Sequence, residues 1–425
     1  MIVAGLVIGM GIFRTPVEVA QKAGIPEVFF MAWLVGALVS LAGALTFAEI
    51  GSRYPVAGGF YKIFTRCYSP RFAFMVNWVI VISNAASTGG VAIMGAAYIA
   101  PVLLPGWSAD TAVKLISVAS ILTIGIINLT GIRMSSRLMN VLMLVKISLL
   151  MVLIASPLFI TPSESQPTAA AALPGDYNML SAFFMCFIPV FFTYGGYQQT
   201  INFGSDIRQP SRNLPLAILA GMTLVTLVYL AVNYSYYSVL GLGGIQSTTT
   251  LAADIMGMMF GETAQRVVSV IMFLSVMAFV NVSVMSNPRV YLAMAEDRVL
   301  PAALGRVNPR TQVPVTGVIV FCSFILITVF FLESFQRILE FVMFFDSVSL
   351  ITAAATIFIL RRRAKTEGEA EGIYKMRAFP LLPLVFILVY GTVMVSVFAA
   401  NPELFFWGLA LFAAGYPLFS MIHRK

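Results

Sequence analysis

The chain has 425 residues, of which 59% are hydrophobic and only 10% are charged, and its net charge is +8. Soluble domains carry about 25% charged residues, so this composition excludes an ordinary soluble fold. The positive charge indicates basic loops beside a membrane rather than a surface for nucleic acid.

Long apolar runs separate the few charged residues. Runs of roughly 20 residues match the ~30 Å hydrocarbon core of a bilayer, so the sequence predicts an all-α polytopic membrane protein. A membrane β-barrel would require short strands of alternating polarity, and these runs are continuous.

Hydropathy and loop punctuation predict about twelve membrane spans. In chain order they cover residues 2–22, 28–50, 72–104, 111–131, 137–158, 177–204, 214–240, 266–295, 314–332, 336–360, 380–400 and 403–422. The connecting loops contain the expected helix breakers, as in "LPGWSAD" and "TPSESQPT".

The distribution of Lys and Arg predicts the orientation of these spans. If the N-terminus lies inside, only Lys22, Lys114, Arg266 and Arg337 fall on the outer side, and the inner loops hold most of the others. Basic loops stay on the cytoplasmic side of a membrane. We therefore expect a multi-pass protein of the cell membrane with both termini in the cytoplasm.

Glycines interrupt two of the spans. The stretch "AGLVIGMGIF", residues 4–13, contains three glycines, and "FFTYGGYQQTINF", residues 191–203, contains the pair Gly195-Gly196. Interrupted helices at matching places in two halves of a chain indicate a transporter with its site at the membrane midplane. Since each half would then hold five helices, an odd number, the halves are expected to have inverted topology.

An unwound turn in the membrane has a specific chemistry. Glycine lets the backbone leave the helix at modest cost, and the freed N–H and C=O groups are tolerated where they face a ligand. The N-terminus of the outer half-helix suits a carboxylate, and carbonyls around Thr193 to Gly195, with those of the first helix, suit an ammonium group. Together they describe an α-amino acid. The alternative is that the glycines only allow close helix packing.

Four segments carry a resemblance to a known family. "GLVIGMGIF" resembles the unwound first helix of the amino acid–polyamine–organocation (APC) superfamily, and "FFTYGGYQQTINFGSDIRQPSRNLP" resembles the sixth helix of its L-type amino acid transporters. "FAEIGSRYPVAGGFY" resembles the end of the second helix and the first inner loop. "NPRVYLAMAEDRVLPAALGRVNPRTQVPV" resembles the end of the eighth helix and the loop that follows. The motifs occur in the family's order over nearly the whole chain.

The resemblance implies a fold of the bacterial leucine transporter type. Its inverted repeats would cover residues 1–158 and 177–360, with two added helices over 378–423. It also implies alternating access, an α-amino acid substrate, and exchange or proton-coupled uptake without sodium. It implies no cofactor, no metal and no nucleic-acid partner.

The implied substrate contacts lie on the two breaks. They are Ile8, Gly9, Met10, Gly11 and Ile12 in the first, and Phe192, Thr193, Tyr194, Gly195 and Gly196 in the second. The family usually has a small residue at the position of Met10, so a side chain facing the site here would shrink it. Animal relatives join an accessory glycoprotein through a cysteine after the third helix. The loop "LPGWSADT" has none, so we expect no disulfide-linked accessory subunit.

Lys146 and Ser283 are the expected coupling residues. Lys146 lies nine residues beyond Arg137, which is about 13 Å of helix rise and deep for snorkelling. The resemblance implies that its ammonium bridges the first helix and the eighth, which contains Ser283, where sodium-coupled relatives hold a cation. The alternative is a snorkelled lysine.

Arg14 and Asp346 are the expected outer gate. Arg14 begins the outer half of the first helix, and Asp346 is the clearest acid inside an apolar span. Charges inside a span face a cavity or each other, and relatives of the leucine transporter type have an Arg–Asp gate in comparable helices. A static pair between Asp346 and Lys146 is the alternative. Glu49 and Asp206 are expected to make inner-loop hydrogen bonds or salt bridges near Arg53, Arg208 or Arg212.

The sequence also bears on three rival functions. An intramembrane enzyme is disfavoured because the only histidine, His423, lies at one end of the chain and a second deep acid is missing. A receptor that binds an amino acid without transporting it stays open. A carrier of polyamines or cationic amino acids is disfavoured, because the site shows no acid beyond Asp346 and a polyamine has no carboxylate. Neutral amino acids are therefore the expected substrates.

Overall fold

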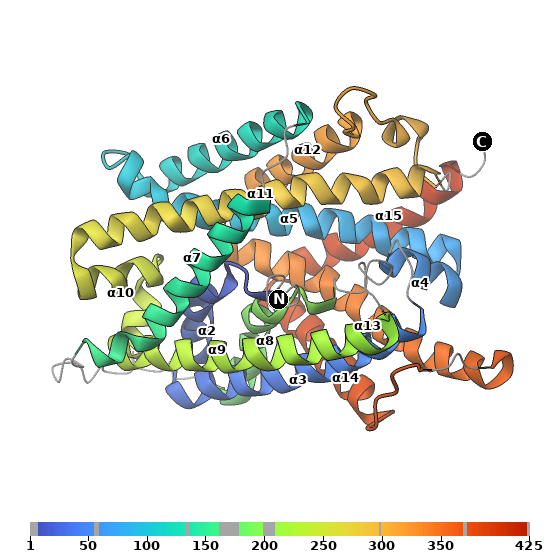
Figure 1. Ribbon diagram of the computed structural model, residues 1–425, viewed down its shortest axis with the longest axis horizontal. Coiled ribbons are helices and arrows are strands. Elements are labelled where there is room, and N and C mark those ends of the chain that lie inside the picture. The colour runs from blue at the N-terminus through green and yellow to red at the C-terminus, as the bar shows by residue number, and fades with distance from the viewer. Residues whose placement is uncertain are drawn as a thin grey trace.

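The computed structural model describes residues 7–54, 59–131, 136–160, 178–198, 209–296, 299–332, 334–368 and 372–422. Regular structure in these ranges is entirely helical (Figure 1). The α-helices are α2 (Thr15–Ala23), α3 (Pro26–Arg53), α4 (Gly59–Cys67), α5 (Pro70–Leu103), α6 (Ala109–Leu129), α7 (Ser136–Ala155), α8 (Met179–Tyr194), α9 (Pro210–Ser247), α10 (Leu251–Phe260), α11 (Glu262–Glu296), α12 (Val315–Leu332), α13 (Phe335–Glu367), α14 (Leu381–Ala400) and α15 (Pro402–Ile422). Short 3₁₀ turns are η1 (Gly11–Phe13), η2 (Ser156–Leu158) and η4 (Ala302–Gly305).

Nine helices within the described ranges are long and apolar enough to cross a membrane. Together with α2, α8 and α12 they account for the twelve predicted spans, so the prediction of an all-helical polytopic membrane protein is confirmed. Two further helices, α4 and α10, were not predicted. Both are short, and hydropathy detects only segments that can cross the bilayer.

The first and sixth spans are broken, as the glycines predicted. After Val7 the first span continues through bends and the turn η1 before α2 begins at Thr15. The sixth span stops at Tyr194, the last residue of α8. Residues 1–6 and 199–208, which include the first glycine of the first span and Asp206, lie outside the described residues.

The long helix α5 forms the centre of one half of the molecule, where it packs against α6, α11, α12, α13 and α15. In the other half α3 packs against α8, α9 and α14. Figure 1 shows α3 and α9 along one edge, with α6 and α12 at the opposite edge. The broken helices α2 and α8 pack against each other between these halves.

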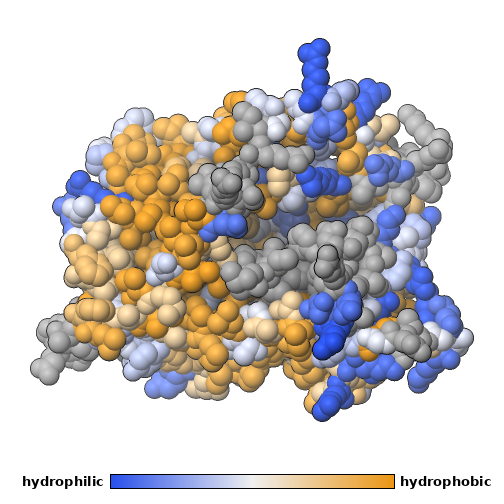
Figure 2. Space-filling model, viewed as in Figure 1, coloured by the Kyte–Doolittle hydropathy of each residue, from blue (hydrophilic) through white to orange (hydrophobic). Residues whose placement is uncertain are grey.

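The surface has the polarity of a membrane protein. Figure 2 shows hydrophobic residues across the middle of one face, with hydrophilic residues gathered toward the end where Figure 1 places α4. Large apolar side chains are exposed on many helices, among them Leu144, Leu227 and Phe331. Such exposure is costly in water and neutral in lipid.

Candidate functional site where two broken helices meet

The two breaks contact each other directly. A Cβ atom added to Gly11 would lie 3.2 Å from the Cα of Thr193, so glycine is the residue that permits this approach. The hydroxyl of Thr15 shares a short hydrogen bond with that of Thr193 and donates another, of 2.9 Å, to the carbonyl of Gly11. The first turn of α2 is therefore fastened to the last turn of α8.

Two buried tyrosines hold the first break open. Tyr229 of α9 donates to the carbonyl of Val7 at 2.8 Å, and Tyr98 of α5 donates to the carbonyl of Phe13 at 3.1 Å. A carbonyl left without a partner in lipid would be costly. These hydroxyls therefore replace helical hydrogen bonds at both ends of the interruption, and sequence reasoning missed them because both tyrosines lie far away in the chain.

The second break has the geometry that its glycines predicted. Gly195 is extended, with φ −60° and ψ 162°, and Gly196 has φ 112°, a region that favours glycine. The N–H of Gly196 donates to Oε1 of Gln198 at 2.9 Å. Gln198 is a further residue that the sequence did not single out.

Exposure divides the ten predicted contacts into two groups. Buried residues are Ile8, Met10, Gly11, Ile12, Thr193 and Tyr194, and partly exposed ones are Gly9, Phe192, Gly195 and Gly196. Met10 is only 2% exposed, so its side chain packs inside the protein. A Cβ added to Gly9 would meet nothing nearer than the Val7 carbonyl at 3.7 Å. A Cβ added to Gly195 would be more crowded, at 3.2 Å from the carbonyl of Phe192, so the two breaks share partial exposure of their backbone.

An aromatic and a cationic side chain lie beside this backbone. The ring of Phe192 makes an edge contact with that of Phe335, the first residue of α13, at 6.2 Å between centroids. The guanidinium of Arg14 lies over the ring of Phe335, and its Cζ is 5.9 Å from the ring centroid. A cavity of about 460 Å³ adjoins Arg14 and Phe335 and extends between α5 and α6 toward Trp107.

The structure does not bring Arg14 and Asp346 together, and the gate between them stays a prediction. Arg14 forms an ion pair of 3.1 Å with Glu18 and donates to the carbonyl of Thr248 at 3.3 Å. Asp346 instead accepts a hydrogen bond of 3.0 Å from Ser83 on α5. Asp346 lies eleven residues beyond Phe335, about 16 Å deeper along α13, and Arg14 lies beside Phe335.

The acid of α13 that faces the outer half of the first helix is Glu340. It forms an ion pair of 3.7 Å with Lys22, and both side chains are largely buried. Arg14, Glu18 and Lys22 are spaced four residues apart, so they share one face of α2. This spacing is visible in the sequence and indicates that the three side chains are neighbours, but the prediction considered only charges deep inside the spans.

Lys146 and Ser283 lie on neighbouring helices, since α7 packs against α11. In the described part of the chain Lys146 makes no hydrogen bond or ion pair, so the alternative pair with Asp346 is not present. The carbonyl of Ser283 accepts from Asn287 at 3.0 Å, and Asn287 in turn accepts from Asn84 of α5 at 2.8 Å. The predicted bridge from Lys146 to the first helix stays a prediction.

Within the described residues no group of three His, Cys, Asp or Glu side chains could hold a metal ion. The polar groups at the breaks are backbone amides and carbonyls with two threonine hydroxyls. They can bind a small zwitterion, and they offer neither a nucleophile paired with a base nor a metal-bound water.

Comparison with known proteins also indicates an amino acid transporter. A family model described as amino acid permease matches residues 1–418. The serine/threonine exchanger SteT of Bacillus subtilis is 28% identical over 393 residues, covering 91% of this chain and 86% of its own. The human b(0,+)-type amino acid transporter 1 is 26% identical, covering 75% and 66%. The rabbit large neutral amino acids transporter small subunit 2 is 23% identical, covering 98% and 78%.

Proposed function

Because the chain belongs to the amino acid permease family and transports amino acids, we propose that it exchanges neutral α-amino acids across the cell membrane by alternating access, without sodium. The observation that carries this proposal is the contact between the two breaks, where Gly11 packs on Thr193 and the backbone of Gly9, Gly195 and Gly196 is partly exposed. The same proposal includes inverted repeats over residues 1–158 and 177–360, followed by two added helices over 378–423. It also places both termini in the cytoplasm.

The backbone of each break has its own task. Amides at Gly9 to Ile12, next to the positive end of α2, bind the substrate carboxylate. Carbonyls from Phe192 to Gly195, at the negative end of α8, bind the ammonium group. Phe192 covers the substrate and contacts Phe335 at 6.2 Å. Backbone recognition of this kind fixes the α-amino acid part and leaves the side chain to a separate pocket.

The substrate side chain is expected to be neutral and small. Among the ten predicted contacts none is charged, so a cationic or anionic side chain would enter a site without a partner. The buried residues Met10 and Tyr194 occupy volume near the breaks. A relative that covers most of the chain is named as a serine/threonine exchanger, which supports small neutral substrates.

Transport in proteoliposomes tests the proposal. Vesicles loaded with unlabelled serine should take up labelled serine faster than empty vesicles, and choline in place of sodium should leave the rate unchanged. Proton-coupled uptake would instead give accumulation in empty vesicles driven by an inward pH gradient. Saturable binding without flux would identify a receptor, and competition by spermidine or arginine would identify a carrier of cations.

We also propose that the protein functions without a disulfide-linked accessory subunit. The cysteines are Cys67 and Cys186, which are buried, and Cys322, which is partly buried. The loop between α5 and α6 contains none. The protein purified from its own membranes should migrate identically on gels with and without reductant, and a larger band that reductant abolishes would contradict this part of the proposal.

A further inference from the structure

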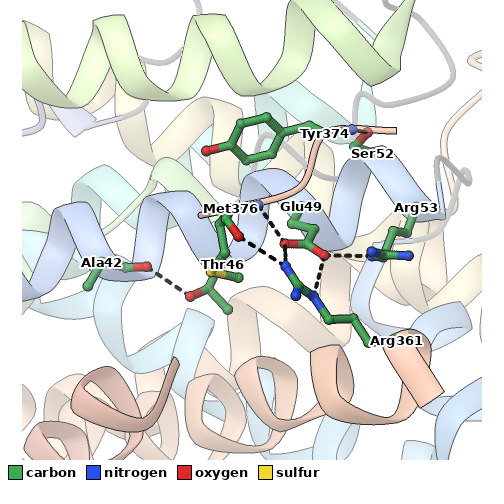
Figure 3. A network of polar contacts seen from close by, with 8 residues as sticks. All are labelled: Ala42, Thr46, Glu49, Ser52, Arg53, Arg361, Tyr374 and Met376. Carbon is green, nitrogen blue, oxygen red and sulfur yellow. Dashed lines mark hydrogen bonds and ion pairs between the residues drawn. The ribbon is translucent and has the colours of Figure 1, made fainter. Parts of the chain in front are cut away.

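The carboxylate of Glu49 is the most completely bonded charge in the described part of the protein. It is 0% exposed and accepts from Nε of Arg53 at 2.7 Å, from Nε and Nη2 of Arg361 at 2.8 and 2.7 Å, and from the N–H of Met376 at 2.8 Å (Figure 3). The contact with Arg53 was predicted, whereas that with Arg361 was not, because the two residues are 312 positions apart. We call these four residues the Glu49 junction.

The junction joins three segments of the chain. Glu49 lies on α3, Arg361 lies near the end of α13, and Met376 lies in the segment that leads to α14. That segment is fixed at a second point, where the N–H of Tyr374 donates to Oγ of Ser52 at 2.9 Å. The guanidinium of Arg361 also stacks on the ring of Phe379 at 3.9 Å.

The hydrogen bonds that join α13 to α5 and to the turn before it are of a weaker kind. Ser83 of α5 donates to Asp346 at 3.0 Å and lies 3.5 Å from the carbonyl of Val342. Tyr68, between α4 and α5, donates to the carbonyl of Thr352 at 2.8 Å. A bidentate pair between ions is roughly twice as strong as neutral bonds, and breaking it would leave Glu49 buried without its partner. The polar link of α13 to α3 is therefore stronger than its polar links near α5, whereas its packing contact with α5 is the more extensive of the two.

Aromatic packing attaches α14 to the same group of helices. Phe386 of α14 contacts Phe47 of α3 at 5.8 Å and Tyr390 at 4.4 Å between ring centroids. Tyr390 stacks on Phe191 of α8 at 4.7 Å. Since Phe191 directly precedes the residues of the second break, α14 contacts both α3 and the helix that carries the substrate site.

We propose that Glu49 and Arg361 are positioning residues for transport, which fasten α13 and α14 to α3 so that these helices move with the substrate site against α5. The inference rests on the proposed function. Helix α13 contains no glycine or proline over its 33 residues, so it lacks the usual sites of a kink. The contact of Arg361 with Glu49 therefore also restrains the position of the opposite end of α13, which begins at Phe335.

Two cross-links test whether the Glu49 junction stays formed throughout transport or acts as a latch, a contact that must break during each cycle. In a chain whose native cysteines are alanine, Ser52→Cys with Tyr374→Cys spans the junction. Gly90→Cys with Ile338→Cys spans the contact between α5 and α13, where an added Cβ at Gly90 lies 3.6 Å from the Cβ of Ile338, within about 3.5–4.5 Å for a disulfide.

We call the variant with Ser52→Cys and Tyr374→Cys the junction pair. Oxidation should leave its rate of serine exchange within about twofold of the rate of the same variant when reduced. In the variant with Gly90→Cys and Ile338→Cys, oxidation should reduce the rate at least tenfold. The opposite pattern would overturn the inference, because it would make the junction a latch. The junction pair should also cross-link to the same extent with and without serine. This gel measurement does not need flux, so it separates failure of the inference from failure of the proposed function.

Substitutions give a second measurement with a matched control. Glu49→Gln and Arg361→Lys, which lose charge or the bidentate geometry, should lower the maximal exchange rate at least tenfold while KM for serine stays within about threefold. Arg362→Lys changes an exposed neighbour and should behave as wild type. Oxidising the junction pair should restore exchange to Glu49→Gln, since a covalent bond then replaces the ion pair. A failure of this rescue would count against positioning as the role of Glu49.

Discussion

At the scale of single residues, the two glycines of the first break, Gly9 and Gly11, have different surroundings. Glycine in an apolar span is a local signal, so Gly9, Gly11 and the pair Gly195-Gly196 were identified correctly as places where the helix stops. Which of them borders open space depends on helices far away in the chain. A Cβ added to Gly9 would contact only nearby backbone at 3.7 Å or more, whereas one added to Gly11 would meet Thr193 at 3.2 Å, although the two glycines look equivalent in the sequence.

This difference predicts opposite effects for two alanine substitutions. Gly9→Ala adds a methyl group to the partly exposed backbone of the proposed site, so it should raise KM about 10–100-fold, the loss of one hydrogen bond to a charged group, with an unchanged melting temperature. Gly11→Ala places its Cβ 3.2 Å from the Thr193 backbone, so it should lower the melting temperature. Transport and thermal unfolding of both variants check this, and equal melting temperatures would refute the assignment.

The charges at the outer end make a second prediction at this scale. Arg14 bonds Glu18 and not Asp346, so a double-mutant cycle should show coupling between Arg14→Ala and Glu18→Ala. The cycle of Arg14→Ala with Asp346→Asn should be additive within about 0.5 kcal/mol, because the sites share no partner. The measured quantity is serine affinity. Strong coupling to Asp346 would return that acid to the outer gate.

At the scale of elements, helix boundaries were predictable where the chain crosses the membrane. The predicted span 72–104 is α5, Pro70–Leu103, since Ser69 caps its start by accepting from the N–H of Phe72. Helix α10 was missed because its stability comes from outside its own sequence. Asp254 accepts hydrogen bonds from Thr248, Thr250 and Gln265, and these residues look like an ordinary polar loop.

Helix α4 yields a test of its own packing. Burial raises the pKa of the Cys67 thiol above its usual value, although Arg66 and Arg363 nearby oppose this effect. Little thiolate is then present near neutral pH, so maleimide labelling of Cys67 in a Cys186→Ala, Cys322→Ala background should be slow and should accelerate as the pH rises. Denaturant should remove the difference from a free thiol. Rapid labelling of the native protein would show that α4 is not packed as described.

At the scale of the whole molecule, composition alone was enough for the fold class. Apolar runs must become helices in lipid, because every backbone group needs a partner there. The same rule cannot say which helices touch. Contacts such as Glu49 with Arg361, or Tyr229 with Val7, join residues more than 200 positions apart, and a single sequence contains no record of them.

Coupling is also a property of the whole molecule. If the Lys146 ammonium takes the place of a cation between α7 and its neighbours, Lys146→Ala should lower exchange at least tenfold while melting changes little. Lys114→Ala removes a partly exposed lysine that pairs with Asp110, and it should leave exchange unchanged. Rates measured in sodium and in choline should agree for the wild type. A strict requirement for sodium would contradict this role.

The hydroxyls of Tyr229 and Tyr98 have a consequence for the thermodynamics of binding. They stabilise the interrupted first helix before any ligand arrives. If the substrate binds at this break, as proposed, it meets backbone that is already unwound and does not have to melt a helix. Little conformational entropy is then lost on association. More of the intrinsic affinity therefore remains available to favour one conformation of the carrier over the other, and a ligand can shift that equilibrium only by such a difference.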